Sequence, residues 1–329
     1  MRNALTDVAG IAVGHWDDPA AGTGCTVILT PQGATGSLDV RGSSPGTRET
    51  DLLQPLGNVD KVHGVVLSGG SAFGLATADG VMRWLDERDY GWPTPVARVP
   101  IVPGAILFDL GVGDPRVRPT AADAYAACQA ATPQDASRGS VGVGMGCTVG
   151  KLLGLERATR GGLGQASVRL PGDIVVAALV AVNSLGDVVD PWAGEIVAGA
   201  REENGLALVD SLAVVQAQAD RFRFRPPPLG ENTTIGVIAT NLSLTKLQCQ
   251  KLAQMGHDGM GRATRPAHTM YDGDCLFALA TGENPRSVEL SVLGAMAAEV
   301  VARAILDGVR SAQPGYGLPA ASQLEPRPL

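Results

Sequence analysis

The chain reads Asn232-Thr233-Thr234-Ile235-Gly236-Val237-Ile238-Ala239-Thr240 directly after a proline-rich segment, 226–231. The β-branched and apolar residues of this run predict a buried strand. A hydroxyl residue that follows asparagine can cut the peptide bond between them through an N-to-O acyl shift, and the new terminal amine can then act as base for the same hydroxyl. The junction of Asn232 and Thr233 is therefore a candidate site of self-cleavage. An ordinary loop that enters an ordinary strand is the alternative interpretation.

A second apolar run, Cys275 to Ala280, begins directly after Asp272-Gly273-Asp274. Between the two runs, Thr245-Lys246-Leu247-Gln248 has the form of a capping box and predicts the start of a helix. A strand-helix-strand unit places its strands side by side, so we expect both carboxylates near Thr233. Asp272 and Asp274 share a strand parity, and two carboxylates that face one way should perturb each other's pKa values. An Asp-Gly turn that merely precedes a strand is the alternative.

The composition is that of a folded protein with a large core. Of 329 residues, 45% are hydrophobic and 18% are charged, enough for one large core or two closely packed halves. The net charge is −7, and Arg221-Phe222-Arg223-Phe224-Arg225 is the strongest basic cluster, so no nucleic-acid partner is expected. The five cysteines are scattered and form no C-x-x-C motif, which predicts reduced thiols and a cytoplasmic location. No secretion signal or membrane-spanning run is evident, so no membrane association is expected.

Strands and helices are predicted along the whole chain. Cys25 to Thr30 and Thr35 to Val40 predict a hairpin around Pro31-Gln32-Gly33. Val62 to Leu67 predicts a strand that turns, with Ser71 as the N-cap, into a helix over about 74–88. The turn does not match the G-x-S-x-G motif of serine hydrolases, because Phe73 stands in place of the last glycine.

The C-terminal part predicts one long helix and a tail. An apolar stripe over 287–311 predicts a long amphipathic helix. The residues after it, 313–329, are rich in proline and polar side chains, and they predict a loose tail. The polar, Gly- and Pro-punctuated segment 41–51 predicts a long loop that either lines a site or lies on the surface.

Lys151 and Asn183 follow two further apolar or glycine-rich segments. The glycine-rich segment 140–151 does not match a phosphate-binding loop, because Met145 replaces the first glycine and Leu152 replaces the Ser or Thr. Lys151 remains as a single cation after a glycine run. The run 174–182 is apolar on both faces, which predicts a strand buried between layers. It ends at Asn183, a residue type that is common in turns.

A change of composition marks a connector in the second half of the chain. Residues 206–225 are first polar and then basic and aromatic, and the proline-rich segment follows them. We predict a flexible connector over about 206–232. Cleavage after it would divide one intertwined domain into a larger fragment, 1–232, and a smaller fragment, 233–329, that begins with the nucleophile.

These motifs resemble a known family. Asn232-Thr233-Thr234 before one apolar strand and Asp272-Gly273-Asp274 before another are similar to the autoprocessing DmpA-type L-aminopeptidase/D-amidase/D-esterase family, and within it to the branch of nylon-oligomer (6-aminohexanoate) hydrolases. The resemblance extends from Leu5-Thr6-Asp7 to the C-terminal helix. It implies an α/β fold, the four-layer α-β-β-α sandwich of the N-terminal-nucleophile type that ornithine acetyltransferases share. It also implies a homo-oligomer, a tetramer of processed heterodimers, with no cofactor.

The same resemblance implies roles for individual residues. Thr233 would be the nucleophile, Asp272 and Asp274 would orient and activate it, and Lys151 would lie beside it. Asn183 would contribute its side-chain amide to the oxyanion hole, a role that its dipole suits. Some members carry, at the position of Phe108, a tyrosine whose hydroxyl helps to bind the oxyanion or the substrate. Phe108 cannot donate a hydrogen bond, so either a water or a backbone amide replaces it or the amide-cleaving step is weaker here.

Three alternative functions fit parts of the sequence. The predicted one is a self-processing amide hydrolase that forms an acyl-enzyme on Thr233 and acts on short peptides, amino-acid amides or 6-aminohexanoate oligomers. An acetyl-transferring enzyme of the ornithine acetyltransferase type is the second, although its Ala-Thr-Met-Leu context is absent. The third is a metal-binding non-enzyme, which would use His257, Asp258, His268, Asp272 and Asp274. Their spacing matches no compact ligand motif, so no metal is expected.

Overall fold

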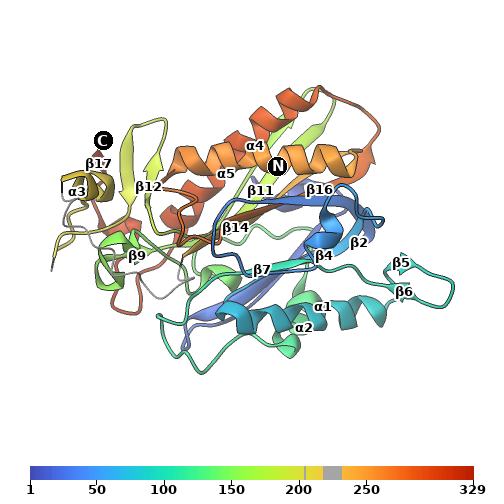
Figure 1. The fold of residues 1–329 in the computed structure, drawn as a ribbon, viewed down its shortest axis with the longest axis horizontal. Coiled ribbons are helices and arrows are strands. Elements are labelled where there is room, and N and C mark those ends of the chain that lie inside the picture. The colour runs from blue at the N-terminus through green and yellow to red at the C-terminus, as the bar shows by residue number, and fades with distance from the viewer. Residues whose placement is uncertain (204, 218–231) are drawn as a thin grey trace.

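One nine-stranded sheet organises the molecule. The computed structural model describes residues 1–203, 205–217 and 232–329 (Figure 1). The strand order is β10-β11-β14-β16-β2-β4-β7-β3, and β1 pairs with β2. The strands of this sheet are β1 (Ala12–Asp18), β2 (Thr23–Val40), β3 (Thr47–Arg48), β4 (Lys61–Ser68), β7 (Gly104–Ile106), β10 (Gly162–Leu170), β11 (Ile174–Asn183), β14 (Thr233–Leu242) and β16 (Cys275–Asn284).

The long strand β2 belongs to both halves of this sheet. Its second part, Thr35–Val40, pairs with β16, whereas its first part pairs with β1 and β4. The predicted hairpin around Pro31-Gln32-Gly33 is therefore wrong, because the chain continues through this segment in one direction. Gly33 has φ 82°, and the pairing with β4 shifts register between Leu29 and Ala34. The turn-forming residues thus produce an irregularity within a strand instead of a reversal.

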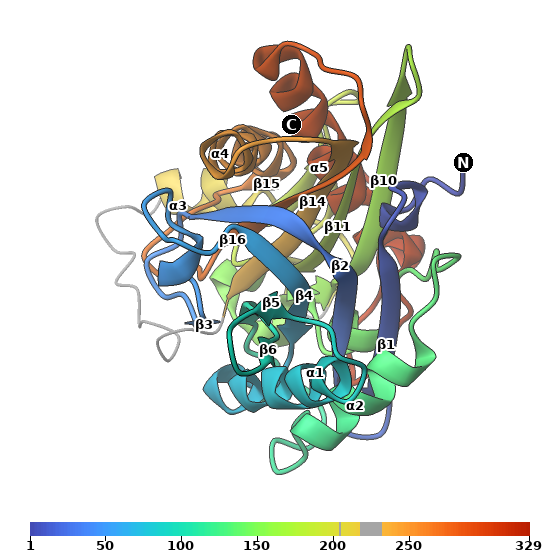
Figure 2. The same ribbon diagram turned by 90° about the vertical axis from the view of Figure 1, so that its right-hand side faces the viewer.

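The two halves of the sheet pack against each other, and helices cover both outer faces. On one side lie α4 (Lys246–Ala263) and α5 (Leu290–Ser311), and on the other lie α1 (Thr77–Asp86) and α2 (Ala121–Ala130) (Figures 1 and 2). Three buried apolar clusters fill the spaces between the four layers. The predicted α-β-β-α sandwich is confirmed.

Strand β11 shows why a central strand is apolar on both faces. Val176, Ala178 and Val180 belong to the cluster under α4 and α5. Ala177, Leu179 and Ala181 belong to the cluster between the two halves of the sheet. Because successive side chains of a strand point to opposite faces, one strand contributes to two cores.

The predicted strand-helix-strand unit is present as β14-α4-β16. Thr245 caps α4, since its side chain accepts a hydrogen bond from the backbone N–H of Gln248 and the Gln248 side chain returns one. Strands β14 and β16 are adjacent and parallel, with Ile235 opposite Cys275. This pairing brings the start of β14 and the start of β16 to the same edge of the sheet.

Three local predictions differ from the structure. Ser71 is not an N-cap: it has φ 55° and begins a 3-10 helix, Ser71–Ala76, after which α1 starts. The C-terminal tail is not loose, because β17 (Arg327–Pro328) pairs with β13 (Glu195–Ala198) and Arg160 donates its backbone N–H to the Pro319 carbonyl. The predicted connector contains a helix, α3 (Ser211–Ala217); its residues 218–231 lie outside the described residues.

The remaining strands are short. They are β5 (Trp92–Pro93), β6 (Arg98–Val99), β8 (Thr148–Val149), β9 (Thr159–Arg160), β12 (Asp187–Asp190) and β15 (Thr264–Arg265). No helix in the described part of the chain combines the length and the apolar character that crossing a bilayer requires.

Candidate active site

Thr233 lies opposite Asn183 in the sheet. It is the first residue of β14, and the antiparallel register pairs it with the last residue of β11. Thr233 is 2% exposed and Asn183 is fully buried. Cross-strand partners have Cβ atoms about 4.5–5.5 Å apart, so the two side chains belong to one site.

The Thr233 hydroxyl contacts the peptide group that precedes it. Its Oγ1 donates a hydrogen bond of 2.5 Å to the carbonyl oxygen of Asn232. The same oxygen accepts the backbone N–H of Gly273 at 2.9 Å. A Cβ at Gly273 would lie 2.9 Å from Thr233 Oγ1 and 2.7 Å from the carbonyl oxygen of Ser44. Only glycine fits between these groups without displacing one of them.

Asp274 fixes the backbone directly after Thr233. Its Oδ1 accepts the N–H of Thr234 at 2.8 Å. Its Oδ2 accepts the backbone N–H of His268 at 3.0 Å and the ring Nδ1–H of the same residue at 2.8 Å. The carboxylate is 2% exposed, so its position is set by these donors and not by solvent.

Asp272 lies on the other side of Gly273 and keeps its proton to a higher pH than an ordinary aspartate. Its Oδ2 accepts from Thr269 N at 2.9 Å and Thr269 Oγ1 at 2.6 Å, and Leu185 N lies 3.4 Å from Oδ1. Burial, together with the negative charge of Asp274, raises the pKa of Asp272 to about 6. The interaction between the two carboxylates, which their shared strand parity predicts, is therefore present.

Lys151 and Thr148 fix the orientation of the Asn183 amide. Lys151 Nζ donates to Asn183 Oδ1 at 2.9 Å and to its backbone carbonyl at 3.0 Å. The backbone N–H of Thr148 also donates to Oδ1, at 3.0 Å. Because donors surround Oδ1, the Nδ2 group faces the opposite way, where the backbone carbonyl of Phe108 accepts one N–H at 3.0 Å. Phe108 thus contacts the site through its backbone.

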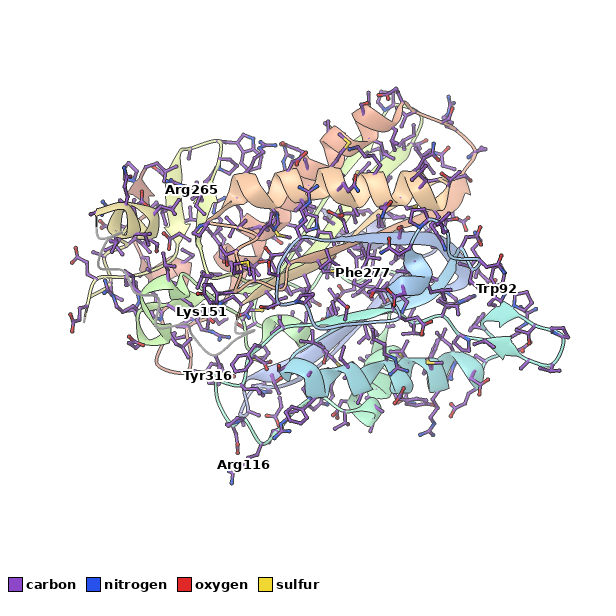
Figure 3. All side chains as sticks on the ribbon, viewed as in Figure 1. Trp92, Arg116, Lys151, Arg265, Phe277 and Tyr316 are labelled. Carbon is purple, nitrogen blue, oxygen red and sulfur yellow. The ribbon has the colours of Figure 1, made fainter. Side chains whose placement is uncertain are left out.

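Lys151 lies towards one end of the molecule, far from Trp92 at the other (Figure 3).

The polar loop 41–51 lies at the site, as one of the two predictions for it states. The backbone N–H of Ser44 donates to the Asp272 carbonyl at 2.9 Å, and the backbone N–H of Arg41 donates to the Asp274 carbonyl at 3.0 Å. These two bonds connect the loop to the backbone of the Asp272-Gly273-Asp274 segment.

His268 is a site residue that the sequence did not reveal as one. The sequence offers it only as one of five residues that a metal-binding protein would use, and its contact with Asp274 depends on a left-handed backbone conformation at φ 57°. No spacing rule predicts such a contact. Among the described residues, no three His, Cys, Asp or Glu side chains are placed to hold a metal ion.

The chain is similar to known proteins over nearly its whole length. The model of "Peptidase family S58" matches residues 3–320. A protein named an uncharacterized aminopeptidase, from Mycobacterium tuberculosis (strain ATCC 25618 / H37Rv), is 43% identical over 98% of both chains. The 6-aminohexanoate-oligomer endohydrolase of Kocuria sp. (strain KY2) is 32% identical over 92% of this chain and 85% of its own.

A solved structure shares the fold along nearly the whole chain. The L-aminopeptidase D-Ala-esterase/amidase of Ochrobactrum anthropi, described as a variant of the Ntn hydrolase fold, superposes with a TM-score of 0.69. The match has 21% sequence identity and covers 94% of this chain and 86% of the other. The resemblance to the DmpA-type enzymes is confirmed. The chain belongs to peptidase family S58, and it is a hydrolase of amide bonds.

Proposed function

We propose that the chain cleaves itself between Asn232 and Thr233, and that Thr233 then serves as an N-terminal nucleophile. The observation that carries this proposal is the hydrogen bond of 2.5 Å between Thr233 Oγ1 and the Asn232 carbonyl oxygen. It places the hydroxyl against the carbonyl group that an N-to-O acyl shift requires. The Gly273 N–H on the same oxygen is placed to stabilise negative charge there.

The cleavage follows from these contacts. Thr233 Oγ1 attacks the carbonyl carbon of Asn232, and the Gly273 N–H stabilises the tetrahedral oxyanion. The bond from this carbon to the Thr233 nitrogen breaks, the nitrogen takes up the proton that Oγ1 gives up, and Asn232 is left as an ester on Oγ1. Water hydrolyses the ester, which releases the Asn232 carboxylate and restores the Thr233 hydroxyl beside a free amine.

The buried Asn232 side chain favours this reaction. Asn232 is fully buried, and within the described residues neither Oδ1 nor Nδ2 has a hydrogen-bond partner. Each unsatisfied buried polar group costs about 1–3 kcal/mol. Cleavage frees the new C-terminus to leave, so that the Asn232 amide regains hydrogen bonds to water. Its departure also vacates the place next to Gly273 for the acyl group of a substrate.

Turnover uses the same groups on a substrate amide. The Thr233 amine accepts the hydroxyl proton, Oγ1 attacks the substrate carbonyl, and the amine of the leaving group departs with that proton. The acyl group is then an ester on Oγ1, and water hydrolyses this ester to release the acid product and restore the Thr233 hydroxyl. Gly273 N–H and the Asn183 amide stabilise the oxyanion, and Lys151 keeps Asn183 in orientation. The Gly273 N–H is the backbone amide that replaces the tyrosine hydroxyl missing at Phe108. Asp274 accepts the backbone N–H of Thr234, and Asp272 is the second carboxylate that orients and activates Thr233.

The substrates we propose are short chains with a terminal ammonium group. The 43% identity with a protein named as an aminopeptidase supports such substrates, and the 32% identity with a 6-aminohexanoate-oligomer endohydrolase supports linear ω-amino-acid oligomers as a second class. A homo-oligomer of processed heterodimers and a cytoplasmic location are part of the same proposal. The family resemblance supports the first, and five free, buried cysteines support the second.

One substrate panel tests the proposal. The processed protein is incubated with L- and D-amino-acid p-nitroanilides, β-peptides and 6-aminohexanoate oligomers, and the products are identified by mass. Stepwise release of one N-terminal residue is the expected result. Internal cleavage of oligomers whose amine is blocked would refute the requirement for an ammonium group, and a processed protein that cleaves none of the panel would refute the substrate class.

A further inference from the structure

We propose that His268 is a positioning residue for the nucleophile and acts through Asp274. The inference rests on the proposed function of Thr233 and adds a residue to that site. Its ring Nδ1–H and its backbone N–H both donate to Asp274 Oδ2, at 2.8 Å and 3.0 Å. The opposite oxygen of the same carboxylate accepts the N–H of Thr234 at 2.8 Å. A continuous path therefore links the imidazole to the residue after the nucleophile.

The path constrains Thr233 because each member has little freedom. Asp274 is 2% exposed, and each of its carboxylate oxygens accepts hydrogen bonds, Oδ1 from Thr234 and Oδ2 from His268. A rotation of its carboxylate would release Thr234, the residue bonded to the nucleophile. After cleavage Thr233 loses the covalent link on its N-terminal side. The hydrogen bond from Thr234 to Asp274 then restrains the new terminus together with the pairing of β14 and β11.

The backbone of His268 is consistent with a specific use of its side chain. Its φ is 57°, in the left-handed region that few residues other than glycine adopt, with asparagine, aspartate and histidine the most frequent among them. In this conformation the backbone N–H and the ring Nδ1–H converge on one oxygen. Among the described residues, ring nitrogen Nε2 is buried without a partner. The hydrogen bonding of this imidazole within the described chain is thus directed at Asp274.

The proton positions in this pair follow from the acceptors. A carboxylate oxygen at this distance requires a proton on His268 Nδ1. His257 packs edge-on against the same ring, with centroids 4.8 Å apart and planes at 72°. His257 is 1% exposed, and its Nε2–H donates to the Asp39 carbonyl at 3.0 Å. His257 therefore holds the ring of His268 in the plane that points Nδ1 at Asp274.

Two substitutions separate the imidazole donor from the backbone conformation. His268→Gly tolerates the left-handed conformation and removes the donor. His268→Asn tolerates the same conformation and offers an N–H close to the place of Nδ1. We expect His268→Gly to lower kcat roughly 10- to 100-fold while KM changes less than about threefold, and His268→Asn to recover most of the loss.

The experiment compares fully processed wild-type, His268→Gly and His268→Asn proteins on the substrate that wild type cleaves best. Processing is followed by intact mass, and Tm is recorded for each. A loss in His268→Gly that His268→Asn repairs supports the proposal. Equal kcat in wild type and His268→Gly, or equal losses in the two variants, would overturn it.

A double-mutant cycle tests whether the imidazole acts through Asp274. If the imidazole acts through Asp274, a second change at His268 should have little additional effect on kcat in an Asp274→Asn background, whereas an additive loss contradicts the link. A catalysis-independent readout distinguishes a failure of the proposed function. In uncleaved Thr233→Ala protein, the low-field imidazole N–H resonance of His268 should be present in proton NMR, and Asp274→Asn should shift it upfield. An unchanged resonance would contradict the contact even if wild type cleaves no substrate at all.

Discussion

Asn183 and Thr233 end and begin adjacent antiparallel strands and lie directly opposite each other. The pairing places an amide side chain and a hydroxyl opposite each other where β11 ends and β14 begins. Lys151 and Thr148 orient the Asn183 amide. The Thr233 hydroxyl donates to the carbonyl of Asn232. The mechanism proposed for this hydrolase depends on this juxtaposition, and the following predictions test its parts.

Gly273→Ala should block self-cleavage in a folded protein. The added Cβ would lie 2.9 Å from Thr233 Oγ1 and 2.7 Å from Ser44 O, so the N–H of residue 273 must move away from the Asn232 carbonyl. Intact mass should show the full-length chain after an incubation in which wild type is cut. Gly261→Ala is the matched control, because no heavy atom lies within 4 Å of its added Cβ. Wild-type processing in Gly273→Ala would contradict the role given to this amide.

Lys151→Met should lower turnover without unfolding the protein. The substitution removes the ammonium group that donates to Asn183 at Oδ1 and at its backbone carbonyl. Loss of one charged hydrogen-bond partner at an oxyanion site suggests a decrease in kcat of roughly 10- to 100-fold. Lys251→Met, on the exposed face of α4, is the control for loss of a positive charge. The same kcat in both variants would show that Asn183 does not need Lys151.

Turnover should rise with pH through about 6 because Asp272 must lose its proton. Burial and the charge of Asp274 raise the pKa of Asp272 to about 6, so the carboxyl is protonated below that value and ionised above it. Profiles of kcat/KM between pH 4.5 and 8, on the order of one point per half unit, resolve this step. Asp272→Asn should be slower and should lose the step near pH 6, whereas the limb that comes from protonation of the Thr233 amine, whose ordinary pKa is about 7.7–8.0, should remain. The same step in Asp272→Asn would assign it to another group, because the two carboxylates titrate as a coupled pair.

Another buried carboxylate, Asp109, should make stability depend on pH. It accepts hydrogen bonds from Thr23 Oγ1 at 2.6 Å and from Gly70 N at 2.7 Å, and burial raises its pKa to about 6. A raised folded-state pKa favours the folded state at low pH, and this contribution is lost as pH rises through about 6. Asp109→Asn cannot ionise. The Tm of the variant minus that of wild type should therefore be more positive at pH 8 than at pH 4, on the order of a few degrees. A difference that is independent of pH would contradict the raised pKa.

The sequence predicts the β14-α4-β16 unit of this site but not the register that places Asn183 opposite Thr233. The β14-α4-β16 unit follows from local patterns, because a capping box and two apolar runs specify helix and strands nearby in the chain. The Asp-Gly-Asp segment then lies beside Thr233 for topological reasons. The opposition of Asn183 and Thr233 depends on the register of two strands far apart in sequence, which no local pattern contains. Only the family resemblance supplied the role of Asn183.

The failed predictions have the same physical origin. Pro31-Gln32-Gly33 is typical of a turn, but the pairing of β2 with β1, β4 and β16 keeps the chain extended. Tertiary hydrogen bonding thus overrides a local turn preference. The contact of His268 with Asp274 was missed because it needs a left-handed backbone at His268, which no local sequence pattern predicts. Loop conformations of this kind are set by the surrounding packing.

The intact masses of wild type, Thr233→Ser and Thr233→Ala after a long incubation test the central claim most directly. Wild type should yield two fragments, 1–232 and 233–329, whose second member begins with threonine on N-terminal sequencing. Thr233→Ser should still be cut because it keeps a hydroxyl, and Thr233→Ala should remain at full length and inactive. A wild-type chain that stays uncut while it hydrolyses amide substrates would contradict the N-terminal-nucleophile mechanism, as would cleavage of Thr233→Ala at the same bond.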